Sequence, residues 1–237
     1  NWEKRITRWA FNQADGVICV SNFTNKVMLE LGILPKSSWV IPNGADDKVF
    51  FPDANRNSRF IFQKFGINSE NKYFLLTVGN VTPRKGQEVV ISAMPMILSE
   101  FPNAEYLMVG LPTDKDRLET LSKKLGVQDH IHFIGKCTQE ELRSFYQNCD
   151  IFVMTSRKLA DGDFEGFGIS VIEAALCQKP AIVSAGSGLE EAVVNGLTGI
   201  CVPENDADKT AWAVIKLLRD TELRSAMSNH AYIRAKQ

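Results

Sequence analysis

Two glutamates stand on either side of a short glycine-rich stretch, at a spacing that could bring both to one ligand. Glu165 opens the run Glu-Gly-Phe-Gly, and Glu173 follows inside the apolar helical pattern that comes next. Glycines before a helix let a ligand approach the backbone, and the free N–H groups of the first turn favour an anion. A carboxylate repels phosphate, so the glutamates must accept hydrogen bonds from hydroxyl or N–H groups. Taken alone, Glu173 could equally be a first-turn glutamate favoured by the helix dipole.

A second stretch could supply the positive charge that a phosphate needs. Residues 79–86 read Gly-Asn-Val-Thr-Pro-Arg-Lys-Gly, so Arg84 and Lys85 are adjacent just before a helical pattern. A forked guanidinium and a point-charge ammonium together suit a diphosphate. The alternative is that one or both are solvated loop charges. Which interpretation holds depends on whether the fold brings this loop to the glutamates.

The elements that must position these residues alternate between short β-branched runs and helical patterns. Continuous Val, Ile, Leu and Phe runs separated by helices predict an α/β fold, a doubly wound parallel sheet covered on both faces. The strands are expected at 17–20, 38–41, 73–79, 104–109, 131–135, 150–154, 180–184 and 199–202. Helices are expected near 22–31, 57–65, 86–99, 114–124, 138–147, 169–177, 188–195, 206–219 and 221–235.

Six strands from residue 73 onward most often take the order 3-2-1-4-5-6, in which the first and fourth strands are neighbours. The first is 73–79 and the fourth is 150–154, so the loops that follow them should face each other across a ligand crevice. Those loops hold Arg84, Lys85 and Glu165. Phosphate between two hydroxyl-binding carboxylates describes a nucleoside diphosphate sugar. The glycine-rich turn at 185–191 is expected beside the crevice, where it could add helix N–H groups or a carboxylate.

Other patterns exclude several classes of protein. No GxGxxG follows the first strand, which argues against a dehydrogenase, and GxxxxGK[ST] is missing, which excludes P-loop phosphoryl transfer. Asp161 and Asp163 flank one glycine without the other ligands of a calcium loop, so we interpret them as turn residues. The histidines His130, His132 and His230 lack metal-ligand spacing.

Composition describes an ordinary globular chain. The 237 residues carry a net charge of −1, with 44% hydrophobic and 23% charged residues, which argues against a nucleic-acid-binding protein. Five cysteines form no CxxC pair and are expected to be reduced thiols, mostly in apolar surroundings. No apolar run approaches the ~20 residues that span a bilayer. The chain begins inside an amphipathic helical pattern, as a fragment would.

The stretch from Glu165 to Glu173 resembles the E-x7-E motif of retaining glycosyltransferases with the GT-B architecture, in the large family four group. Other stretches match in order: Val20-Ser21, 42–46, 79–86, 149–153, 187–191 and 195–199. The resemblance covers essentially the whole chain. It implies a transferase that moves a sugar from a UDP-, GDP- or ADP-sugar to a glycan or lipid-linked acceptor hydroxyl with retention, without a cofactor and without a metal.

The resemblance also implies roles for individual residues. Lys85, with Arg84 nearby, would neutralise the donor pyrophosphate and stabilise the leaving nucleoside diphosphate. Glu165 would bind the donor sugar, Glu173 the ribose, and Lys136 the base. The donor would also meet Gly79, Asn80, Gly166, and the backbone N–H groups of Phe167, Gly168 and Ile169. Many members have Arg where this chain has Asn80, and Arg84 is expected to compensate for that difference.

The same resemblance predicts a division of the chain near residue 45. Residues 1–45 would be the tail of an N-terminal acceptor domain and its hinge, and residues 46–237 the donor-binding Rossmann-like domain. The isolated chain would bind a nucleotide but transfer sugar poorly. The location implied is the cytoplasm, with room for peripheral association with the inner face of the membrane through the N-terminal domain. Two alternatives remain: a non-catalytic nucleotide-sugar-binding module, and a sugar-nucleotide epimerase on the same fold.

Overall fold

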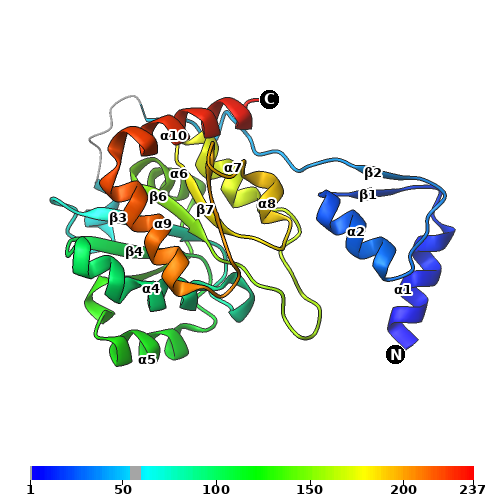
Figure 1. Ribbon diagram of the computed structural model, residues 1–237, viewed down its shortest axis with the longest axis horizontal. Helices are drawn as coiled ribbons and strands as arrows, with labels where there is room; N and C mark the ends of the chain where they lie inside the picture. Colours follow the sequence, from blue (N-terminus) through cyan, green and yellow to red (C-terminus); the bar gives the residue numbers. More distant parts are fainter. Residues whose placement is uncertain (1, 54–59) are drawn as a thin grey trace.

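The computed structural model describes residues 2–53 and 60–237, which form two parallel β-sheets of unequal size (Figure 1). The smaller sheet pairs β1 (Val17–Cys19) with β2 (Ser38–Val40) and lies beside α1 (Trp2–Gln13) and α2 (Asn22–Glu30). We call these four elements the N-terminal unit. A long extended connection leads from β2 to the rest of the chain, and Figure 1 shows the N-terminal unit on the right of that connection.

The larger sheet has six parallel strands in the order β5-β4-β3-β6-β7-β8. This is the doubly wound order that the sequence predicts, with the first and fourth strands of the sheet, β3 and β6, side by side. Its strands are β3 (Tyr73–Val78), β4 (Ala104–Val109), β5 (Ile131–Gly135), β6 (Ile151–Met154), β7 (Ala181–Ser184) and β8 (Gly199–Val202). The helices are α3 (Phe60–Lys64), α4 (Gln87–Glu100), α5 (Lys115–Leu125), α6 (Gln139–Asn148), α7 (Ile169–Leu176), α8 (Leu189–Ala192), α9 (Ala207–Arg219) and α10 (Thr221–Ala235).

Each face of this sheet has its own hydrophobic core, because successive strand residues point to opposite sides. In β3, Leu75 packs into a cluster with α4 and α9, whereas Phe74 and Leu76 pack into a second cluster with α6 and α7. All three side chains are fully buried. The alternation explains the continuous apolar strand sequence, since both faces are covered by helices.

The junction between β3 and β6 is reinforced by side chains. The Phe74 N–H donates to Asp150 Oδ2 at 2.8 Å, and the buried Thr77 hydroxyl donates to the Val153 carbonyl at 2.5 Å. Beyond the strand ends, the Thr155 hydroxyl donates to the Gly86 carbonyl at 2.8 Å. We call this junction the central seam, and it fixes the two loops that carry the expected site.

Most expected elements are confirmed to within one or two residues, but one expected helix is shorter and two short helices are additional. The helix expected at 188–195 is the short α8, because Val193 adopts extended backbone and Asn195 forms a bridge to Gly199. Two 3-10 helices, η1 (Pro83–Lys85) and η2 (Gln128–His130), were not anticipated. Part of the helix expected at 57–65, residues 57–59, lies outside the described residues.

Two expectations from composition can be compared with the structure. All five cysteines are free, with Cys19, Cys149 and Cys177 buried and Cys137 and Cys201 half-buried. Burial raises the pKa of the Cys149 thiol to about 12, as expected of an inert core residue. Within the described ranges, no helix is both long and apolar enough to cross a membrane.

Candidate active site

The loop after β3 and the loop after β6 meet at the end of the central seam. Glu165 Oε2 accepts a hydrogen bond from Arg84 Nη1 at 2.7 Å and one from Lys85 Nζ at 2.6 Å. All three side chains are largely withdrawn from solvent, with exposed fractions of 23% for Arg84 and 14% for Lys85 and Glu165. Arg84 and Lys85 are therefore in direct contact with Glu165. The sequence predicts that these residues lie on opposite sides of one crevice.

A second carboxylate from the same loop also contacts Arg84. Asp163 Oδ2 lies 3.0 Å from Arg84 Nε, so the guanidinium is held between Asp163 and Glu165. Asp163 was expected from the sequence to be a turn residue without a part in the site. Its position two residues before Glu165 was the available signal, because an exposed acidic loop residue beside a site glutamate can reach the same cation.

The backbone fixes the cation loop against the loop after β6. The Arg157 N–H donates to the Arg84 carbonyl at 2.8 Å, next to the Thr155–Gly86 hydrogen bond of the central seam. η1 turns the chain so that Arg84 and Lys85 occupy its last turn, and Gly86 ends it with φ +69°. A Cβ at Gly86 would lie 1.9 Å from the Thr155 carbonyl oxygen, so the close approach of the two loops requires glycine.

Glu173 lies on the core-facing side of α7, outside the cluster formed by Arg84, Lys85 and Glu165. Its Oε2 accepts a hydrogen bond from the buried Tyr146 hydroxyl at 2.6 Å. Burial raises the pKa of Glu173 above its ordinary value, although the hydrogen bond from Tyr146 acts in the opposite direction. Sequence reasoning missed Tyr146, since nothing in the α6 pattern distinguishes a tyrosine that binds a carboxylate from one that only fills the core.

The glycine-rich stretch between the two glutamates leads directly into α7. Gly166 and Gly168 precede the helix, Phe167 is buried, and Ile169 is the first helical residue and is exposed. Gly168 provides no side chain to cap the helix. The first N–H groups of a helix have no partner within it, so this turn presents donors beside Glu165. That arrangement suits a phosphate or another anionic group.

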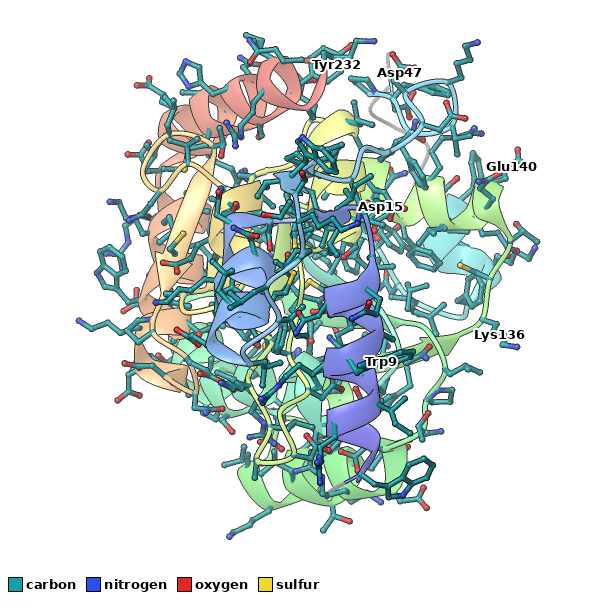
Figure 2. All side chains as sticks on the ribbon, turned by 90° about the vertical axis from the view of Figure 1, so that its right-hand side faces the viewer. Trp9, Asp15, Asp47, Lys136, Glu140 and Tyr232 are labelled. Carbon is teal, nitrogen blue, oxygen red and sulfur yellow. The ribbon has the colours of Figure 1, made fainter. Side chains whose placement is uncertain are left out.

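Three other expected site residues lie in the loops after β3 and β5. Gly79 lies under the Lys85 side chain, where a Cβ would come within 3.2 Å of Lys85 Cε. Asn80 Oδ1 accepts a hydrogen bond from the Leu111 N–H at 3.3 Å, so its amide braces the neighbouring loop. Lys136 follows β5, is exposed, and extends from the surface in Figure 2. The structure thus brings Gly79 to the cations and leaves Lys136 exposed after β5.

The glutamates of the turn at 185–191 bind backbone N–H groups in this structure. Glu190 Oε2 accepts from the Gly186 N–H at 2.8 Å, within its own turn. Glu191 accepts from two N–H groups at the start of α2, in the N-terminal unit. Across the described residues, no group of three or more His, Cys, Asp or Glu side chains is arranged to hold a metal ion.

Two family models match the chain, and together they cover most of it. The model described as Glycosyl transferases group 1 matches residues 57–234, and the model Glycosyltransferase Family 4 matches residues 1–49. One curated relative is the GDP-mannose-dependent alpha-(1-6)-phosphatidylinositol monomannoside mannosyltransferase of Mycolicibacterium smegmatis. It is 30% identical over 217 residues, which cover 91% of this chain and 56% of the relative. The chain therefore spans about half the length of the curated relatives it matches.

Solved structures agree on the fold. The C-terminal domain of a glycosyl transferase group 1 family protein (LpcC) from Francisella tularensis is 28% identical, with a TM-score of 0.70. The match covers 81% of this chain and 97% of that domain. The Anabaena protein HepE, solved with UDP and glucose, superimposes with a TM-score of 0.87 over 100% of this chain and 62% of its own length, at 23% identity. The six-stranded sheet is thus that of a GT-B C-terminal domain.

Proposed function

The chain belongs to the glycosyl transferases group 1 family, and from that premise we propose that it is the donor-binding part of a retaining glycosyltransferase. The reaction would move a sugar from a nucleoside diphosphate sugar to an acceptor hydroxyl. The observation that carries the proposal is the contact of Arg84 and Lys85 with Glu165, beside the uncapped start of α7. This arrangement places positive charge and helix N–H groups at the topological switch point, outside the carboxyl ends of β3 and β6.

The proposed chemistry is electrostatic. Lys85 and Arg84 would bind the donor pyrophosphate and stabilise the charge that develops on the leaving nucleoside diphosphate. The N–H groups of Phe167, Gly168 and Ile169 would add donors to the same phosphates. Both cations contact Glu165 in the structure. Diphosphate would replace Glu165 as their partner, which frees the Glu165 carboxylate to accept hydrogen bonds from sugar hydroxyls.

The other assignments complete the donor site. Glu173 would bind the ribose hydroxyls, Lys136 the base, and Asn80, near Gly79, would line the phosphate end without neutralising it. The Mycolicibacterium relative is GDP-mannose-dependent, which supports testing GDP-mannose first, with UDP- and ADP-sugars as competing donors. Its lipid substrate supports a lipid-linked acceptor, and with it a protein that works at the cytoplasmic face of a membrane. We propose no metal and no cofactor.

A thermal-shift panel tests the proposal. A ligand that binds only the folded chain at one hundred times its Kd stabilises it by about 2.7 kcal/mol. We expect one nucleoside diphosphate among UDP, GDP and ADP to raise Tm by several degrees, and its sugar conjugate to raise Tm as well. If none of the three diphosphates and none of their sugars shifts Tm at millimolar concentration, the chain is not a donor-binding domain.

We also propose that the 237 residues alone transfer sugar poorly. The matched relatives are about twice as long, and the acceptor is expected to bind mainly to the part of them that this chain does not span. Product formation from the bound donor, measured with and without a separately supplied N-terminal domain, tests this. Efficient transfer by the 237 residues alone would contradict it.

A further inference from the structure

We propose that Glu191 is a positioning residue, which joins the N-terminal unit to the loop that carries Glu165. The inference rests on the proposed function, because it concerns how the donor sugar is held. The contacts involved lie between α2, the start of α8 and residues 164–168, which we call the donor loop. Glu191 would act through these contacts without touching the donor.

The first contact is between the Glu191 carboxylate and the start of α2. Glu191 Oε2 accepts from the Asn22 N–H at 2.8 Å and from Asn22 Nδ2 at 2.8 Å, and Oε1 accepts from the Phe23 N–H at 2.7 Å. The first N–H groups of a helix lack intrahelical partners, and a carboxylate is their strongest acceptor. Here that acceptor comes from the large sheet's side of the molecule.

The second contact joins the same end of α2 to the donor loop. The fully buried Ser21 hydroxyl donates to the Gly166 carbonyl at 2.7 Å, and it also accepts from the Thr24 N–H at 2.9 Å as the helix N-cap. Next to it, the rings of Phe23 and Phe164 meet edge to face with centroids 5.1 Å apart. The residue directly after Glu165 is therefore hydrogen-bonded to the N-terminal unit.

The third contact holds the donor loop from the other side. The Gly188 N–H donates to the Glu165 carbonyl at 3.0 Å. A Cβ at Gly188 would lie 1.8 Å from the Gly166 carbonyl oxygen, so the two backbones are in close contact. Gly188 is the N-cap of α8, which carries Glu191. The backbone of Glu165 and Gly166 is thus held between the start of α2 and the start of α8, and Glu191 ties those two helices together.

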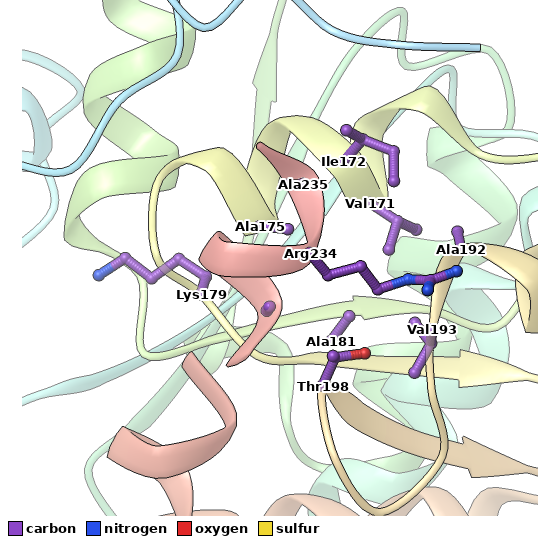
Figure 3. A pocket seen from close by; sticks show the side chains of 11 residues that line it. Val171, Ile172, Ala175, Lys179, Ala181, Ala192, Val193, Thr198, Arg234 and Ala235 are labelled. Carbon is purple, nitrogen blue, oxygen red and sulfur yellow. The ribbon is translucent and has the colours of Figure 1, made fainter. Parts of the chain in front are cut away.

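Glu191 is itself held from behind by α10. Arg234 extends from α10 towards Ala192 and Val193 (Figure 3), and its Nη2 donates to the Glu191 carbonyl at 3.0 Å. A groove of about 820 Å³ lies alongside, lined by residues 42–44 of the connection together with Asn22, Glu191 and Arg234. Glu191 and Asn22, which are hydrogen-bonded to each other, both line this groove.

These contacts predict a selective effect on the sugar end of the donor. Glu165 is the residue proposed to bind the sugar, whereas the two cations proposed to bind the diphosphate, Arg84 and Lys85, lie in a loop that is held by the central seam and not by α2. Releasing α2 should therefore weaken binding of a nucleotide sugar more than binding of its nucleoside diphosphate. A residue that only stabilised the fold would weaken both equally.

The test compares Glu191→Gln with the wild-type 237-residue chain. Glu222→Gln is the matched control, since Glu222 is an exposed glutamate in the first turn of α10. Hydrogen exchange is measured at α2 and at the donor loop, and calorimetry gives Kd for GDP, GDP-mannose, UDP and UDP-glucose. We expect exchange in both segments to rise about tenfold, the factor that corresponds to one charged hydrogen bond. The Kd of the bound nucleotide sugar should rise about fivefold more than that of its diphosphate.

Two results would overturn the inference: exchange in the donor loop that stays unchanged, or a Kd of the nucleotide sugar that rises no more than the Kd of its diphosphate. Weaker sugar binding without faster loop exchange would indicate that Glu191 touches the sugar directly. If the wild-type chain binds no nucleotide, the proposed function is wrong. Hydrogen exchange in the donor loop of Glu191→Gln still tests whether Glu191 positions that loop. Arg234→Gln, which releases the Glu191 main chain, should change the same quantities in the same direction, and it replaces Glu191→Gln if that variant does not fold.

Discussion

At the scale of single residues, Glu165 accepts hydrogen bonds from both cations of the candidate site. Lys85 is partly buried and Glu165 is its carboxylate partner, whereas Arg84 is shared between Glu165 and Asp163; a buried charge without a partner is costly. A donor diphosphate would compete with Glu165 for these cations. Affinity depends on the difference between two charged contacts, so the cation side chains should affect it strongly.

Lys85→Ala should raise the Kd of the nucleoside diphosphate about ten- to hundredfold, because a hydrogen bond to a charged group contributes about 1.5–3 kcal/mol. Isothermal calorimetry measures the change. Lys123→Ala is the control, since Lys123 is an exposed lysine of α5 away from the central seam. A Kd equal to that of the control would remove Lys85 from the proposed site.

Glu173→Gln should stabilise the ligand-free chain and weaken its binding of nucleoside diphosphate. The pKa of Glu173 is raised in the folded chain, so the unfolded chain ionises first as pH rises from about the ordinary value of 4.5. Wild-type stability falls over that interval relative to the neutral amide. The Tm advantage of Glu173→Gln should therefore be larger at pH 7 than at pH 4. An advantage that is independent of pH would show that the carboxylate is not destabilised by burial.

At the scale of elements, the site depends on two loops that the central seam holds within hydrogen-bonding distance. Arg84 is positioned by its own carbonyl, which accepts from Arg157, and by the turn that ends at Gly86. The loop after β6 is in turn held by Thr155. Loop geometry, more than any single side chain, decides whether the cations reach Glu165.

Gly86→Ala should destabilise the fold much more than Gly126→Ala. Both glycines have φ +69°, but a Cβ at Gly86 would meet the Thr155 carbonyl at 1.9 Å, whereas a Cβ at Gly126 would meet nothing within 4 Å. We expect a loss of about 1–2 kcal/mol at Gly126 from backbone strain alone. At Gly86 we expect about 3–5 kcal/mol, since the clash adds to the strain. Urea unfolding measures both, and equal losses would mean that the loops separate freely.

The continuous apolar runs predicted parallel strands buried on both faces, and the commonest order of six such strands then predicted the strand order and the approach of the two loops. The same reasoning placed Arg84 and Lys85 opposite Glu165 without any contact being visible in the sequence. Contacts between distant side chains were not predictable: Tyr146 on Glu173 and Glu191 on α2 depend on helix orientation, which periodicity does not specify. α8 was predicted too long because the turn at Asn195 overrides its helical pattern.

At the scale of the whole molecule, a buried acidic group lies at the opposite end of the sheet from the candidate site. Glu105, with 5% of its side chain exposed, accepts from Lys72 Nζ at 2.6 Å and contacts His132 Nε2 at 2.8 Å. Burial alone would raise the pKa of Glu105, but the contacts with His132 and Lys72 hold it below its ordinary value. This carboxylate therefore ties β4 to β5 and to the start of β3 through its charge.

Stability from Glu105 should be lost in acid. Because its folded pKa is lowered, the contribution is complete above the unfolded value of about 4.5 and disappears as pH falls through the folded one. The difference in Tm between wild type and Glu105→Gln should thus be large at pH 7 and shrink below about pH 4.5. Glu222→Gln, measured alongside, should show no such trend. A difference that stays constant into acid would contradict the role given to the charge.

The central seam also has a consequence for how the chain folds. Local strand–helix–strand connections join the three strands on each side of the seam, β3 to β5 and β6 to β8. The pairing of Leu75 with Ile151 across the seam closes a much longer loop. Closing that loop costs more entropy and is slower. Arg84 and Glu165 lie on opposite sides of this junction, so neither half of the sheet alone contains a site. A bound nucleotide would therefore act as a clamp between the halves, slowing their separation more than any local unfolding.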